Sequence, residues 1–348
     1  RLSSNEEIFK LMDDGKIDYV VYTGKTDVES ISNYISLHHH AILLGITVLT
    51  SLDTANALAD CIAGRYNQFN TELVDINNLR KLKLKFSKMH SCGNDYIFFN
   101  NMDGAITCPE SLAINFADRH YAIGGDGVVM IEKSSAGAAK VNVYNRDGSL
   151  AGLAANPIRC VAKYLFDNGY SGGEMSIETC CGMKKLSVSS FNGKASSVSV
   201  NLGKPETDKS AKKIVYGGKE LNAYYVNVGN PHCVIFCDKV ESVDMDVLGQ
   251  AVTESNLFPQ GVFVECVRVV NRVTVKMRVW EKGNGETWAC GTAAAATAVA
   301  SIVNGFCAYG EIITVKLKGG DLFVKYENDG DIELDGTVKL SFEGSIEI

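Results

Sequence analysis

The sequence predicts an α+β fold of two pseudo-symmetric halves, each a mostly antiparallel sheet wrapped around a central helix, preceded by a partial parallel α/β unit. Residues 276–290 repeat residues 140–154 at an offset of 136 residues. Two further pairs share this offset: Asn168-Gly169 with Asn304-Gly305, and Gly93-Asn94 with Gly229-Asn230. Strand patterns with a period of two residues dominate after Phe86. A strand-helix-strand-helix order fills residues 1–80, which is typical of a parallel unit.

Composition limits the domain count, the compartment and the partners. A chain of 348 residues is long for one core, so we expect two or three domains. The net charge of −7 and the lack of a dominant basic tract argue against nucleic acid or membrane as a partner. The longest apolar run, Ala293–Val303, is too short to cross a bilayer, and no secretory signal opens the chain. The chain has eleven cysteines, an odd number that favours free thiols in a reducing cytoplasm over disulfides. Because no CxxC pair occurs, we expect no metal site.

Residues 1–80 are expected to form the separate parallel unit. Its predicted strands are Ile17–Tyr22 and Ile46–Leu49, and its predicted helices are Asp27–Leu44 and Asp53–Tyr66. Asp53 is the expected N-cap of the second helix. Two strands make a thin sheet, so this unit is expected to lack its first half. The polar stretch Asn67–Lys85 is predicted to be a solvated linker.

The part that starts at Phe86 is predicted to combine many short strands with four helices. The expected helices are Glu110–Tyr121 and Asn156–Asp167 in the first half, and Asp244–Ser255 and Gly291–Val303 in the second. The last of these is apolar on nearly all sides, which predicts a helix buried throughout. The clearest strand patterns are Asp95–Phe99, Gly127–Ile131, Lys140–Tyr144, Ser187–Ser190, Val226–Val228, Cys233–Phe236, Val267–Asn271, Val273–Val279 and Ile313–Leu317.

The repeat carries a thiol in only one copy. Cys290 precedes the helix that begins near Gly291, and Ala154 holds the matching position in the first copy. A helix N-terminus has free amide groups and a partial positive charge, which favour a thiolate. Cys290 is therefore the candidate catalytic base or nucleophile. The alternative is an inert, small, buried hydrophobic residue.

Polar residues around the two helix starts form the candidate binding site. The amides of Gly291 and Thr292, together with the helix start at Asn156, are suited to a substrate carboxylate. Each asparagine alone also has an explanation as a turn residue. Four side chains at matching repeat positions are predicted to grip an amino group and side-chain ends: Asn94, Asn145, Asn230 and Glu281.

Six motifs connect residues from about 84 to 348 with a known family. They are Lys88–Asp95, Arg119–Gly127, Tyr144–Ser149, Asn156–Cys160, Gly229–Cys233 and Gly285–Thr292. These motifs resemble the diaminopimelate epimerase family. The resemblance implies interconversion of LL- and meso-diaminopimelate without a cofactor, in lysine biosynthesis, by one thiolate that removes the α-proton and a second thiol that supplies one from the opposite face. It also implies that Cys290 is one acid/base thiol, that Gly291 and Thr292 bind the reacting carboxylate, and that Asn94, Asn145, Asn156, Asn230 and Glu281 contact the substrate.

The chain departs from that family where the second thiol is expected. Ala154 replaces this cysteine, and Ala155 and Pro157 replace the glycines that flank Asn156. Losing an acid/base group typically costs about 10²–10⁴-fold in rate or more, so we expect weak or lost inversion. Cys160 lies almost two helical turns from the helix start, too far along to substitute.

The far end of the predicted pocket also differs, and this leaves alternatives open. Phe263 stands where the family has an asparagine, and Lys282 replaces an arginine whose two-point grip a lysine lacks. The chain is therefore an isomerase by resemblance, or a non-catalytic amino-acid-binding protein that uses the same cleft, or a racemase of the same fold with another substrate. The expected partner is a small-molecule substrate, and the resemblance suggests a homodimer.

The N-terminal unit carries a second resemblance. The segments Ile17–Gly24 and His38–Asn56 resemble the C-terminal regulatory domain of the carbamoyl-phosphate synthase large chain, which binds nucleotide effectors. The two resemblances imply a partial methylglyoxal synthase-like domain at residues 1–80, an epimerase N-terminal half at 84–200 and a C-terminal half at 201–337, with 338–348 returning to the first half. An orphaned fragment without effector binding is the alternative.

Overall fold

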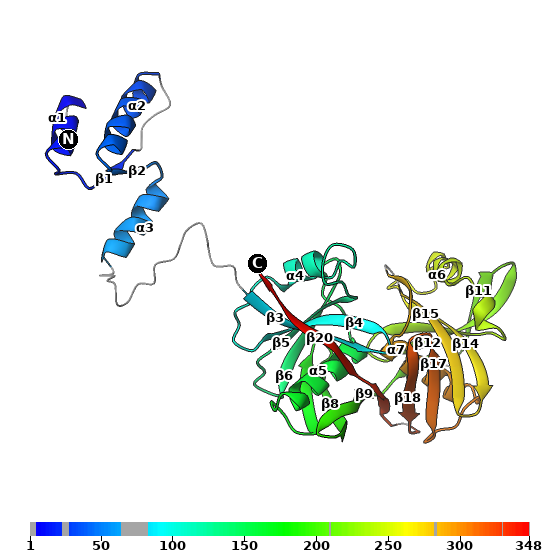
Figure 1. Ribbon diagram of the computed structural model, residues 1–348. Coiled ribbons are helices and arrows are strands. Elements are labelled where there is room, and N and C mark those ends of the chain that lie inside the picture. The colour runs from blue at the N-terminus through cyan, green and yellow to red at the C-terminus, as the bar shows by residue number, and fades with distance from the viewer. Residues whose placement is uncertain are drawn as a thin grey trace. The chain divides into compact units, whose positions relative to one another are not determined.

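The computed structural model describes residues 5–22, 28–63, 83–208, 210–281, 284–328 and 330–347. The chain divides into two compact units, Arg1–Lys81 and Leu82–Ile348, which Figure 1 traces by colour. Within the described ranges, no helix combines the length and the apolar character that crossing a membrane requires.

The described part of the first unit places two parallel strands among three helices. Its elements are α1 (Asn5–Asp13), β1 (Tyr19–Val21), α2 (Val28–Leu43), β2 (Thr47–Leu49) and α3 (Leu52–Ala63). The pairing of β1 with β2 is parallel, as expected from the strand-helix-strand order. Helix α1 was not predicted. Asp53 is not the N-cap: it lies in the first turn of α3, and its amide donates to Ser51 Oγ at 3.2 Å, so Ser51 caps the helix. The predicted helix end at Tyr66 lies outside the described residues.

The strands of the second unit join one 18-stranded sheet. Those of the first half are β3 (Lys83–Ser91), β4 (Asn94–Asn101), β5 (Gly127–Glu132), β6 (Ala139–Asn145), β7 (Glu174–Thr179), β8 (Gly182–Phe191) and β9 (Lys194–Gly203). The others are β10 (Glu206–Thr207), β11 (Lys212–Tyr216), β12 (Lys219–Asn227), β13 (Pro231–Phe236), β14 (Phe263–Asn271), β15 (Thr274–Glu281), β16 (Gly285–Thr287), β17 (Ile312–Leu317), β18 (Gly320–Tyr326), β19 (Ile332–Thr337) and β20 (Lys339–Glu347).

The start of β3 corrects the predicted linker. Lys83–Lys85 belong to the strand rather than to a solvated connection. The side chains of Leu84 and Phe86 alternate with lysines and are buried, because this edge pairs antiparallel with β20 at the other end of the chain. The rest of the predicted linker lies outside the described residues.

The two halves repeat one pairing order. In the first half, successive pairs from β3 to β9 run antiparallel, parallel, antiparallel, parallel, antiparallel and antiparallel. The pairs β12–β13, β13–β14, β14–β15, β15–β17, β17–β18 and β18–β19 follow the same order of directions. The sequence repeat is therefore a structural repeat. Two pairings join distant parts of the second unit: β19 with β9, and β20 with β3, where Figure 1 shows β20 crossing beside β3.

The helices of the second unit divide into outer and central ones. Outer helices are α4 (Pro109–Phe116) and α6 (Met245–Glu254), with the short 3-10 helix η2 (Val240–Ser242); the central ones are α5 (Ala155–Asp167) and α7 (Gly291–Val303). Helix α7 has the predicted bounds. Helix α4 ends before the predicted Tyr121, because Asp118 accepts the amides of His120 and Tyr121 and makes a turn instead.

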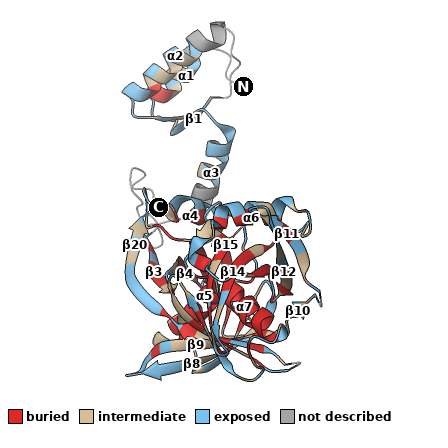
Figure 2. Ribbon diagram, turned by 90° about the vertical axis from the view of Figure 1, so that its right-hand side faces the viewer, coloured by how far each residue is buried: buried red, intermediate tan, exposed pale blue. Residues whose placement is uncertain are grey.

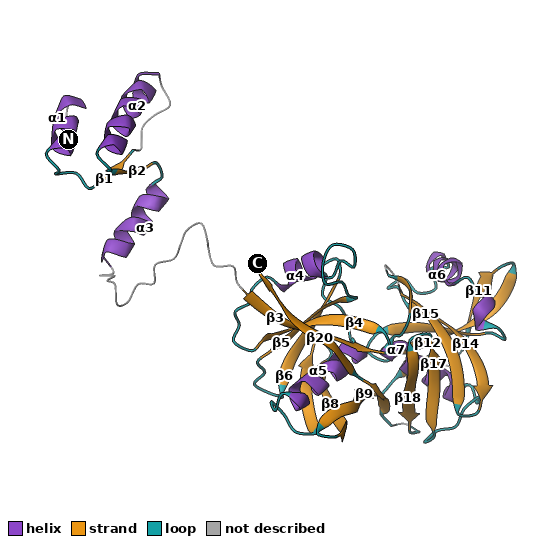
Figure 3. Cartoon of the chain, in the orientation of Figure 1, coloured by secondary structure: helices purple, strands orange, loops and turns teal. Residues whose placement is uncertain are grey.

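Each half wraps its strands around one central helix (Figure 3). Every residue of α7 from Gly291 to Ile302 is buried, as is most of α5, and Figure 2 shows buried residues along both. Alanine-rich α7 has little side-chain volume, which lets strands from all around approach its backbone. The predicted fold class is confirmed.

Candidate active site

The two central helices begin against each other. Ala154 is the N-cap residue of α5, and Cys290 is the N-cap residue of α7. A Cβ atom added to Gly291 would lie 2.9 Å from Ala155 Cβ and 2.9 Å from Asn156 Oδ1. The first turns of the two helices are therefore packed closely, with no room for a side chain at Gly291.

A cavity of about 190 Å³ opens at these helix starts. Its lining contains Ala154 and Cys290 together, and also Phe263. It also contains every other residue of the predicted site: Asn94, Asn145, Asn156, Asn230, Glu281, Gly291 and Thr292. The structure thus brings the whole predicted set to one cavity. Lys282 lies outside the described residues.

A chain of hydrogen bonds orients Asn156 and Asn94. Asn156 Nδ2 donates to Asn94 Oδ1 at 3.0 Å, and Asn94 Nδ2 donates to Asp126 Oδ2 at 2.8 Å. The fully buried Arg159 donates to Asn156 Oδ1 at 2.6 Å and to Ser91 Oγ at 2.9 Å. These bonds hold the amide groups in one orientation at the cavity wall.

Asn230 connects the two helix starts. Its Nδ2 donates to the carbonyl of Leu153 at 2.7 Å, and the Leu153 amide donates back to Asn230 Oδ1 at 3.2 Å. The same Nδ2 lies 3.4 Å from Thr292 Oγ1 on α7. Asn145 also lines the cavity, but its Nδ2 donates to Ser149 Oγ at 3.0 Å, so this asparagine additionally closes the turn after β6.

The Cys290 thiol is not the preformed thiolate that its helix position suggested. Burial and the negative charge of Glu281 raise its pKa, and the Thr292 hydroxyl and Ala293 amide, which act in the opposite direction, do not compensate. The sulfur lies 3.4 Å from Thr292 Oγ1. Burial of the thiol away from water therefore outweighs the field of the helix terminus.

Cys160 does not supply the missing thiol. It is buried inside α5 and does not belong to the cavity lining. Burial raises the pKa of Cys160 to about 12, so it stays protonated near neutral pH.

Glu281 faces Cys290 from the end of β15. Its Oε1 accepts from Thr287 Oγ1 at 2.8 Å, and its Oε2 accepts from Asn284 Nδ2 at 3.3 Å. Burial raises the pKa of Glu281 despite these bonds, and the charge of Asp126 acts in the same direction. A ligand ammonium group beside Glu281 would lower the pKa of Glu281 again, because its positive charge opposes both the burial and the charge of Asp126.

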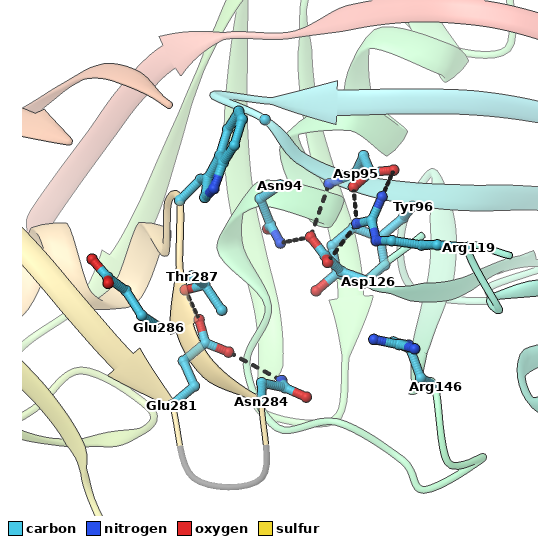
Figure 4. A pocket seen from close by; sticks show the side chains of 12 residues that line it. Asn94, Asp95, Tyr96, Arg119, Asp126, Arg146, Glu281, Asn284, Glu286 and Thr287 are labelled. Carbon is cyan, nitrogen blue, oxygen red and sulfur yellow. Dashed lines mark hydrogen bonds and ion pairs between the residues drawn. The ribbon is translucent and has the colours of Figure 1, made fainter. Parts of the chain in front are cut away.

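A second cavity of about 370 Å³ adjoins the first and shares Asn94, Tyr96, Glu281 and Asn284 with it (Figure 4). The residues that only this outer cavity contains were not predicted as site residues: Gly93, Asp95, Arg119, Asp126, Arg146, Glu286, Thr287 and Trp288. All eight lie within four of the six motifs, Lys88–Asp95, Arg119–Gly127, Tyr144–Ser149 and Gly285–Thr292, so the sequence did contain a signal for them. Arg119 donates to both Asp95 and Asp126, which fixes the acidic side of this cavity.

Comparison with known proteins identifies the family. The sequence model of diaminopimelate epimerase matches residues 86–207 and 224–340, one stretch in each half. The diaminopimelate epimerase of Acetivibrio thermocellus is 38% identical over 279 residues, covering 76% of this chain and 99% of that protein. That of Agathobacter rectalis is 36% identical over 286 residues, covering 76% and 100%.

Solved structures with low sequence identity share the fold. A hydroxyproline epimerase from Agrobacterium vitis superposes with a TM-score of 0.62 at 13% identity, covering 78% of this chain and 94% of that chain. A predicted epimerase from Pseudomonas aeruginosa gives 0.58 at 15% identity, covering 76% and 99%. The repeated sheet, the paired helix starts and the curated relatives lead to one conclusion: the chain is an isomerase by descent and belongs to the diaminopimelate epimerase family.

Proposed function

We propose that this chain binds diaminopimelate or a close relative between the starts of α5 and α7, and that Cys290 moves the α-proton on one face only. One observation carries the proposal. Ala154 and Cys290 are the N-cap residues of matching helices and line the same cavity, but only one of them has a thiol. A two-base inversion needs a proton donor on each face of the α-carbon.

The chemistry follows from this asymmetry. The substrate carboxylate binds the free amides at the helix starts, and its ammonium group lies beside Glu281, which partly offsets the negative charge that raises the pKa of Cys290. The thiolate of Cys290 then takes the α-proton and returns a proton to the same face. Because the methyl group of Ala154 cannot donate a proton, the stereocentre is retained and inversion is weak or lost.

Proton exchange in deuterated water tests the proposal. We expect the unchanged chain to wash deuterium into the α-position of LL-diaminopimelate while forming little of the meso form. Ala154→Cys should raise inversion by about 10²-fold or more. Cys290→Ala is the matched control and should abolish both exchange and inversion. Rapid inversion by the unchanged chain would refute the one-thiol mechanism.

A non-catalytic binding protein is the second candidate. Phe263 supports it, because this aromatic ring lines the same cavity as Ala154. An apolar ring there favours a ligand with an apolar segment over one with a polar far end. Calorimetry with a panel of amino acids separates the candidates: a ligand that binds tighter than diaminopimelate and shows no α-proton exchange would favour this reading.

We infer from sequence resemblance that residues 1–80 are related to the regulatory domain of the carbamoyl-phosphate synthase large chain. The parallel pair β1–β2 supports a parallel unit. A homodimer and a cytoplasmic location are family-based proposals of the same kind. Sedimentation of the purified chain tests the first, and fractionation of source cells tests the second.

A further inference from the structure

Two cysteines meet on the face of the sheet that packs against α6. Cys237 follows β13 directly, and Cys266 lies on the neighbouring parallel strand β14. The Cys237 amide donates to the carbonyl of Val267 at 2.8 Å, which continues the pairing of the two strands past the end of β13. Both cysteines belong to the hydrophobic cluster under α6, Cys266 as a buried member and Cys237 at its half-buried edge.

The two sulfur atoms lie closer together than those of an ordinary pair of thiols. Cys237 Sγ and Cys266 Sγ are 2.6 Å apart, although both residues are free cysteines. The adjacent thiols of Cys180 and Cys181, by comparison, are 3.7 Å apart. A disulfide has a sulfur–sulfur distance of about 2.05 Å. The two strands therefore already bring these sulfurs within reach of a covalent bond.

A bond between the two cysteines would span the crossover that joins β13 to β14. This connection contains η2 and α6, and the cysteines are 29 residues apart in the sequence. Arg278 on β15 holds the crossover at one point, where its Nη1 donates to the carbonyls of Val240 and Val243 at 2.9 and 2.7 Å. A disulfide would add a covalent hold and close the crossover into a ring, which restricts the unfolded chain.

The two thiols differ in exposure and in acidity. Cys266 is only 1% exposed, whereas the half-buried Cys237 is open to a small molecule from solvent. The hydrogen bond from the Cys266 thiol lowers the pKa of Cys237, and the same contact together with burial raises the pKa of Cys266. Cys237 is therefore the thiol that a small oxidant reaches and attacks first, and Cys266 is the thiol behind it.

We propose that Cys237 and Cys266 are a site of reversible oxidation, at which a peroxide produces a disulfide that fixes the crossover between β13 and β14. Hydrogen peroxide transfers one oxygen to the Cys237 thiolate, which becomes a sulfenic acid, and hydroxide leaves. The Cys266 sulfur then attacks the Cys237 sulfur: the sulfur–sulfur bond forms, the sulfur–oxygen bond breaks, and the second oxygen leaves as water with the thiol proton. Two thiols are thus oxidised, and one peroxide is reduced to two waters.

Peptide mapping without reduction tests the proposal on the full chain. After treatment with hydrogen peroxide and alkylation of the remaining thiols, we expect one linked peptide that contains Cys237 and Cys266 and that dithiothreitol separates. The melting temperature of the oxidised chain should lie about 5 °C above that of the reduced chain and return on reduction. Cys237→Ser changes the more exposed partner and should abolish both the linked peptide and the rise in melting temperature.

Cys181→Ser is the matched control, because it removes one thiol of the exposed pair whose sulfurs are further apart. This variant should keep the linked peptide and the rise in melting temperature. The inference is overturned if Cys237 and Cys266 are still alkylated separately after peroxide treatment, or if either is linked to a different cysteine. A linked peptide without a higher melting temperature would contradict the proposed hold on the crossover.

Discussion

At the scale of single residues, the site depends on the charges around one sulfur. The helix start supplies an amide and a hydroxyl that lower the pKa of Cys290, whereas burial and Glu281 raise it more. The same carboxylate is itself destabilised by burial and by Asp126. A cationic ligand group between them lowers the energy of both anions, so the substrate is expected to activate the thiol that acts on it.

Glu281→Gln tests this coupling. The substitution removes a negative charge that raises the pKa of Cys290, so the thiolate fraction at a fixed pH below that pKa should increase. We expect alkylation of Cys290 by iodoacetamide at pH 8 to become about two- to tenfold faster, resolved by peptide mass spectrometry. The exposed Cys108 is the internal control and should react at an unchanged rate. Slower alkylation of Cys290 would contradict the assignment of Glu281 as a cause of the raised pKa.

At the scale of elements, both central helices end in the same way. The amide of Gly169 donates to the carbonyl of Phe166, and that of Gly305 donates to Ile302. Both glycines have a left-handed backbone, with φ of 74° and 76°. The Asn-Gly pairs that made the repeat visible are therefore helix caps, and their spacing follows from helices of equal length.

Gly305→Ala should destabilise the second unit by about 1–2 kcal/mol, because an L-residue in the left-handed region clashes with its own backbone. An added Cβ would have nothing within 4 Å, so lost packing does not contribute. Gly172→Ala is the matched control: it also has open space but no positive φ, and no loss is expected. Urea unfolding measures both. A loss at Gly172 as large as that at Gly305 would rule out the backbone explanation.

At the scale of the whole molecule, the site belongs to one unit. Every residue that lines the two cavities lies between Gly93 and Thr292, inside the unit Leu82–Ile348. That unit contains its own hydrophobic core around α5 and α7. Residues 1–81 are a separate unit with a single parallel strand pair among its described residues.

A chain shortened to residues 82–348 should fold and bind LL-diaminopimelate within about twofold of the full chain, because a compact unit with its own core is able to fold alone. Calorimetry on both chains measures this. We also expect no thermal shift of the full chain with uridine or inosine monophosphate, because the described part of residues 1–81 has only one pair of parallel strands. A shift with either nucleotide would contradict this expectation, and loss of amino-acid binding on shortening would show that the two units depend on each other.

The repeat, the central helices and the residues of the inner cavity could be predicted from the sequence. Alternating hydrophobicity, helix caps and the duplicated motifs can all be seen in the sequence, so Cys290, Ala154 and Asn230 could be predicted to lie at one site before the fold was known. The linker prediction failed at Lys83–Lys85 because the partner of that strand, β20, comes from the far end of the chain. The outer cavity was not predicted, because the motifs that contain its residues do not show by themselves that these side chains lie together.

The charge state of the thiol and the surroundings of Arg146 depend on contacts between distant parts of the chain. A helix start seen in sequence predicts a lowered pKa for Cys290, but the net shift depends on how much water the surrounding sheet excludes and on Glu281 across the cavity. In the same way, Arg119 and Arg146 both line the outer cavity, and among the residues that the structure describes only Arg119 makes ion pairs at carboxylates. Burial and charge pairing are sums over neighbours distant in the chain, so local patterns do not determine them.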